Sequence, residues 1–123
     1  LGTIDDTTTD TFYGAYKLLL EGLIDKYPDK IIFTITPPQL PTSNYSYRLE
    51  DVANAIVEVS KLYGIPCLDL YHGCNGFNGR PSQWAIYHPT NPSNPSGYDI
   101  HPNSAGQNKL SIPIEKFLVN LLV

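Results

Sequence analysis

Two short apolar runs, each set between longer amphipathic segments, constrain this chain more than any other feature of its sequence. They occupy residues 31–36 (IIFTIT) and 65–71 (IPCLDLY). Continuous apolar runs of this length are typical of strands that are covered on both faces, as in parallel sheets. We therefore expect two buried strands at these positions.

Helical segments alternate with the two runs. Apolar residues recur at helical spacing over 12–24, 49–63 and 103–122, which predicts three helices. Thr9 or Asp10 is the expected N-cap of the first helix, because either side chain can accept a hydrogen bond from a free backbone N–H. An alternation of helices and buried strands predicts an α/β fold with a parallel sheet.

Two strands alone cannot form a sheet that is covered on both faces. The chain also contains no Met and begins at Leu1. We therefore expect residues 1–123 to be the C-terminal part of one larger α/β domain, with further strands upstream of Leu1 or in another chain.

Composition excludes several classes of protein. Eight Lys and Arg against twelve Asp and Glu give a net charge of −4, which argues against a nucleic-acid surface. No apolar run is long enough to predict a membrane span. Cys67 and Cys74 are too few for a disulfide scaffold, and either a bridge between them or two thiols is open. No spacing of His, Cys and carboxylates suggests a metal site.

The candidate chemistry lies after the second run. Residues 72–99 show no sustained periodicity and are interrupted repeatedly by Gly and Pro. Ligands of open parallel sheets bind beyond the carboxyl ends of the strands, where this connection begins. It leads into His101, which stands at the start of the last helix with Asp99 two residues before it. Such a histidine is a candidate general base, because a carboxylate can fix its tautomer and stabilise its charged form.

The segment Asp-Ile-His-Pro-Asn-Ser-Ala-Gly (99–106) resembles the last motif block of the SGNH (GDSL-like) hydrolases, usually written Asp-x-x-His-Pro. The helix, strand and Pro-Pro of 11–39, the run YGIPCLDLY and the closing helix resemble the same family. The resemblance implies a three-layer α/β/α, flavodoxin-like fold. It also implies a serine esterase that acts on acyl esters or carbohydrate O-acetyl esters and needs no cofactor.

The resemblance assigns His101 the role of base and Asp99 the role of orienting it. The family's Asp stands three residues before the His, a position held here by Tyr98. The chain contains no Gly-Asp-Ser and no Gly-x-Asn-Asp, so we expect the nucleophile and the Asn block upstream of Leu1 or in a companion chain.

Three further side chains are candidates for contact with substrate. His88, Trp84 and Tyr87 lie in the long connection and could line a groove or stack against a sugar. They are also compatible with ordinary packing. The alternative function is therefore a non-catalytic glycan-binding or degenerate hydrolase module of a larger surface or phage-tail-like protein.

Overall fold

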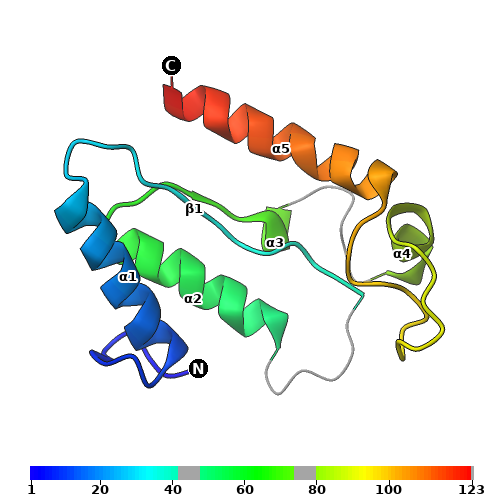
Figure 1. Cartoon of the computed structure of the whole chain (residues 1–123), viewed down its shortest axis with the longest axis horizontal. Helices are drawn as coiled ribbons and strands as arrows, with labels where there is room; N and C mark the ends of the chain where they lie inside the picture. Colours follow the sequence, from blue (N-terminus) through cyan, green and yellow to red (C-terminus); the bar gives the residue numbers. More distant parts are fainter. Residues whose placement is uncertain (42–47, 74–79, 123) are drawn as a thin grey trace. The chain divides into compact units, whose positions relative to one another are not determined.

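The computed structural model describes residues 1–41, 48–73 and 80–122. Within these ranges the elements run helix, strand, helix, strand and then three helices (Figure 1). The chain divides into two compact units, Leu1–Thr36 with Tyr47–Asp69, and Pro37–Ser46 with Leu70–Val123.

Two long helices form most of the first unit. α1 spans Phe12–Lys26 and α2 spans Leu49–Leu62, which confirms both predictions to within a few residues. The predicted N-cap of α1 was wrong, since Thr11 holds that position. The Thr11 hydroxyl accepts from the backbone N–H of Gly14 at 3.1 Å, and Thr9 and Asp10 stand too early in the chain to do so.

A two-stranded parallel sheet accompanies these helices. β1 (Thr34–Ile35) pairs with β2 (Cys67–Leu68) in the register Thr34 to Cys67 and Ile35 to Leu68. This confirms the parallel pairing and the α/β character of the fold. The strands are shorter than the apolar runs that predicted them, because only these residues meet a partner strand among the described residues.

The core of the first unit lies between the helices. In Figure 1, α1 and α2 lie on the same side of the two strands. The buried cluster consists of Tyr13 and Leu20 from α1 with Ala55 and Val59 from α2. These side chains supply the hydrophobic stabilisation of the unit.

The second unit is helical in its described part. Its elements are α3 (Leu70–Gly73), α4 (Pro81–Tyr87) and α5 (Ser104–Leu122), and α4 packs against α5. α5 confirms the predicted closing helix. The sequence did not predict α3 or α4, since the end of the second run was expected to be strand and 72–99 to be irregular. Among the described helices, none combines the length and apolar character that a membrane crossing requires.

Candidate active site

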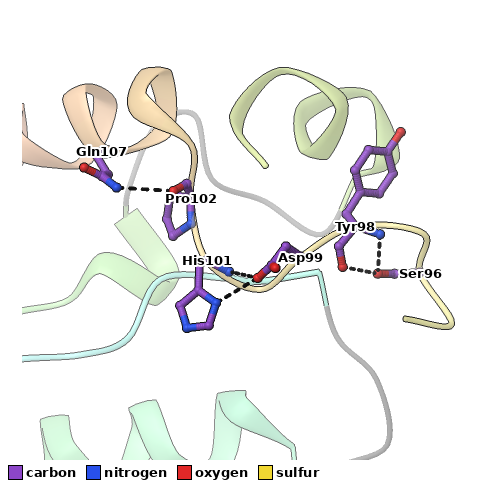
Figure 2. Close-up of polar contacts among 6 residues, drawn as sticks. All are labelled: Ser96, Tyr98, Asp99, His101, Pro102 and Gln107. Atoms are coloured by element: carbon purple, nitrogen blue, oxygen red, sulfur yellow. Dashed lines mark hydrogen bonds and ion pairs between the residues drawn. The ribbon is translucent and has the colours of Figure 1, made fainter. Parts of the chain in front are cut away.

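Asp99 and His101 are in direct contact through a single carboxylate oxygen (Figure 2). Oδ1 of Asp99 accepts a hydrogen bond from the backbone N–H of His101 at 2.8 Å. The same oxygen lies 2.8 Å from Nδ1 of the His101 ring. A side-chain acceptor bonded to the backbone N–H two residues later is an Asx-turn. The turn brings the carboxylate to the ring even though the aspartate is one residue closer than in the family pattern.

The contact determines which ring nitrogen carries the proton. An ionised carboxylate only accepts hydrogen bonds, so Nδ1 of His101 donates and Nε2 of the neutral ring keeps its lone pair. The His101 side chain is 83% exposed, and that of Asp99 is 36% exposed. Nε2 is therefore an accessible proton acceptor on a ring held by a carboxylate, as a general base requires.

Hydrogen bonding keeps Asp99 ionised. The backbone N–H of His101 is the largest cause of the lowered pKa of the Asp99 carboxyl, and the His101 ring is the next. A carboxylate that stays charged to a lower pH continues to stabilise a protonated imidazole. The geometry is compatible with the orienting role that the family resemblance assigns to Asp99, and that role stays a prediction.

Tyr98, which precedes the Asp99–His101 pair, takes part in a short antiparallel backbone contact. Thr90 and Tyr98 form an isolated β-bridge. The backbone N–H of Asp99 donates to the carbonyl of Pro89 at 2.8 Å. These backbone contacts hold residues 89–90, which follow α4, beside the segment that carries Asp99.

Asn103 holds the backbone on the C-terminal side of the Asp99–His101 pair. Its side-chain oxygen accepts from the backbone N–H of Gly106 at 2.9 Å, which caps the first turn of α5. Its amide nitrogen donates to the carbonyl of Ile86 at 2.9 Å, and its backbone N–H donates to the carbonyl of Tyr87 at 2.8 Å. Sequence reasoning missed this role, although an Asn directly before Ser-Ala-Gly is a recognisable N-cap signal.

The three predicted substrate-contact residues lie on or beside α4. Trp84 packs edge to face on Tyr98, with ring centroids 6.3 Å apart. Tyr87 ends the helix and is half-buried. His88 is only 3% exposed, so its ring lies inside the unit. The structure brings His88 close to the Asp99–His101 pair, while a role of any of the three in substrate binding stays a prediction.

The described residues contain no cluster of three His, Cys, Asp or Glu side chains that could hold a metal ion. Cys67 carries a free thiol, whereas Cys74 lies outside the described residues.

Comparison with known proteins shows a likeness of fold and assigns no activity. No protein-family model matches the chain, and no curated protein sequence matches it. A crystal structure of a protein from Lactobacillus plantarum, a Northeast Structural Genomics consortium target, is 30% identical with a TM-score of 0.79. A second crystal structure is 23% identical with a TM-score of 0.76, which shows likeness of fold alone. Each match covers 98% of this chain, but the chain spans only 59% and 57% of the two proteins.

Proposed function

We propose that this chain supplies the His/Asp side of the active site of a serine ester hydrolase of the SGNH type. The observation that carries the proposal is the 2.8 Å contact between Asp99 Oδ1 and His101 Nδ1 on an exposed ring. This contact removes the main objection from the sequence, which was the shifted position of the aspartate. The motif resemblance at 99–106 and the geometry of the pair support the same chemistry.

The proposed reaction has two halves. Nε2 of His101 takes the proton of a serine hydroxyl while the serine oxygen attacks the ester carbonyl. The protonated ring then gives that proton to the leaving alcohol, and an acyl-enzyme remains. Water attacks the acyl-enzyme by the same route and releases the carboxylic acid. Asp99 stabilises the imidazolium in both halves, because its carboxylate is held on Nδ1.

The proposal places the serine outside these residues, in a preceding part of the same domain or in a companion chain. The complete domain would be a three-layer, flavodoxin-like fold. The parallel pairing of β1 with β2 supports this, as does the greater length of the two similar crystal structures. The proposed substrates are short acyl esters or O-acetyl esters of carbohydrates, and no cofactor takes part.

The test is hydrolysis of p-nitrophenyl acetate by the full-length protein that contains this chain. We expect His101→Ala to lower the rate to the background of the uncatalysed reaction. Exposed imidazoles hydrolyse this ester weakly by themselves, so His72→Ala is the matched control. His72 is an exposed histidine of the same unit and should be dispensable.

Retained activity in His101→Ala would refute the assigned base. A wild-type protein that is inactive on p-nitrophenyl acetate and on acetylated sugars would refute the esterase and favour a glycan-binding module. Labelling of the full-length protein with a fluorophosphonate, followed by mass spectrometry, locates the nucleophilic serine independently.

A further inference from the structure

The position of the His101 ring depends on its backbone, because the side chain has little packing around it. It is 83% exposed, and the contact that holds the ring is with Asp99, two residues earlier. In Figure 2 the ring points away from α4 and from the start of α5. Both members of the pair lie on one short segment, residues 99–103. The bonds that hold this segment therefore also set the direction in which Nε2 of His101 points.

Both ends of the segment are hydrogen-bonded to the end of α4 and the residues that follow it. The backbone N–H of Asp99 donates to the carbonyl of Pro89, and that of Asn103 donates to the carbonyl of Tyr87, both at 2.8 Å. His101 stands midway between these two bonded residues. The segment is thus closed at both ends against residues 87–89, with the candidate base at its centre.

At one of these ends a side chain adds to the backbone bond. Nδ2 of Asn103 donates to the carbonyl of Ile86 at 2.9 Å, while Oδ1 accepts from the backbone N–H of Gly106 at 2.9 Å. Carbonyls in the last turn of a helix have no partner within that helix. Asn103 therefore satisfies the carbonyls of Ile86 and Tyr87 at the end of α4 and caps the first turn of α5.

α4 depends on contacts of this kind because it is short. It has seven residues, and none of them is buried. Helices of this length are unstable by themselves and need tertiary contacts. The bonds from Asn103 are such contacts, so the end of α4 and the segment that carries His101 hold each other in place.

We propose that Asn103 is a positioning residue for the candidate base: its amide bond to the Ile86 carbonyl holds residues 99–103 against the end of α4 and so directs the His101 ring. The inference deepens the proposed function and rests on it for its catalytic meaning. A cap of α5 requires only the side-chain oxygen of Asn103, whereas positioning also requires its amide donor. Substitution can separate these two roles.

Two substitutions keep the cap and remove the donor. Asn103→Asp has nearly the shape of the wild-type side chain, and aspartate caps helices well, but a carboxylate cannot donate to Ile86. Asn103→Ser also caps, and its hydroxyl is too short to reach Ile86. Aspartate adds a negative charge near His101 and serine does not, so the two variants together separate loss of the donor from an effect of charge. Ser111→Ala is the control, since it removes a side-chain bond to the Asn108 carbonyl elsewhere in α5.

The first readout is backbone hydrogen exchange, followed by NMR of the full-length protein and corrected for the intrinsic rate of each residue type. In both Asn103 variants the N–H of residue 103, which is bonded to Tyr87, should exchange about twofold to fivefold faster than in wild type. The N–H of Gly106 should stay protected, because the cap remains. Unchanged exchange at residue 103 would overturn the proposal. So would equal acceleration at residues 103 and 106, which would indicate loss of the cap.

Hydrolysis of p-nitrophenyl acetate is the second readout, and it separates this inference from the proposed function. If the full-length protein hydrolyses this ester, both Asn103 variants should lower kcat about tenfold with little change in KM, because a small displacement of the base slows the chemical step. Ser111→Ala should keep the wild-type kcat. An unchanged kcat in either Asn103 variant would overturn the positioning role. If the wild-type protein is inactive, the esterase proposal fails, and hydrogen exchange still decides whether Asn103 holds the segment.

Discussion

Replacement of Asn103 by alanine should destabilise the second unit, and the loss of stability can be divided between two hydrogen bonds. The side chain makes two hydrogen bonds, one from Gly106 N–H to its oxygen and one from its amide to the Ile86 carbonyl, both 2.9 Å long. Loss of an N-cap costs about 1 kcal/mol. The bond to Ile86 is exposed and neutral, so its loss costs about 0.5 kcal/mol. The cap therefore dominates a total of about 1.5 kcal/mol.

The assay is reversible unfolding followed by fluorescence of Trp84, the single tryptophan, which lies in the same unit. For a cooperative unit of this size, about 1.5 kcal/mol corresponds to a fall in Tm of about 6–12 °C. Asn103→Ser is the matched variant, because serine caps a helix but is too short to reach Ile86. We expect it to cost about 0.5 kcal/mol.

Two results would show that this division is wrong. Equal destabilisation by Asn103→Ser and Asn103→Ala would mean that the bond to Ile86, and not the cap, carries the stability. An unfolding curve of Asn103→Ala that coincides with wild type would mean that neither bond contributes.

Three other changes have expected outcomes. In the full-length protein, Asp99→Ala should lower kcat for p-nitrophenyl acetate about tenfold to a thousandfold. An unchanged rate would show that the Asp99 carboxylate does not contribute to the reaction. The pKa of Tyr13 and that of Tyr63 are both raised to about 12, with desolvation as the largest cause. The stability that comes from keeping these phenols neutral is therefore fully present below about pH 10 and is lost as the pH rises toward 12. Urea unfolding between pH 9 and 12 should show this loss, and Tyr13→Phe should reduce it. Thr11→Ala removes the acceptor for Gly14 N–H and should cost about 1 kcal/mol in the same assay, while Thr11→Ser should cost little.

Long periodic helices were the part of the fold that sequence could predict. α1, α2 and α5 each extend over 14 or more residues, so their apolar stripes are repeated several times. α4 has seven residues and buries none of them, which leaves no stripe to recognise. The apolar runs indicated the positions of both strands, but the expected burial was wrong, since Ile31 is 58% exposed and neither residue of β2 is fully buried. Strand length depends on a partner elsewhere in the chain, and β1 and β2 pair over two residues each.

The candidate site was predictable only in part, for a similar reason. The sequence indicated His101 and Asp99 because they are two residues apart and belong to a recognisable motif. The spacing did not establish how the two side chains would meet, because the Asx-turn that joins them depends on a local hydrogen bond. His88 is 3% exposed, and the residues on either side of it are bonded to the backbone of Asp99 and Asn103, ten or more residues away. No local pattern in the sequence encodes such packing.

The short separation of Asp99 and His101 along the chain has a mechanical consequence. Among the described residues, the hydrogen bonds between Asp99 and His101 lie within the second unit. If the second unit moves in the proposed reaction, the imidazole and its carboxylate move together. The proton affinity of His101 and its position relative to the proposed serine would then be separate properties, and mutation could change one without the other.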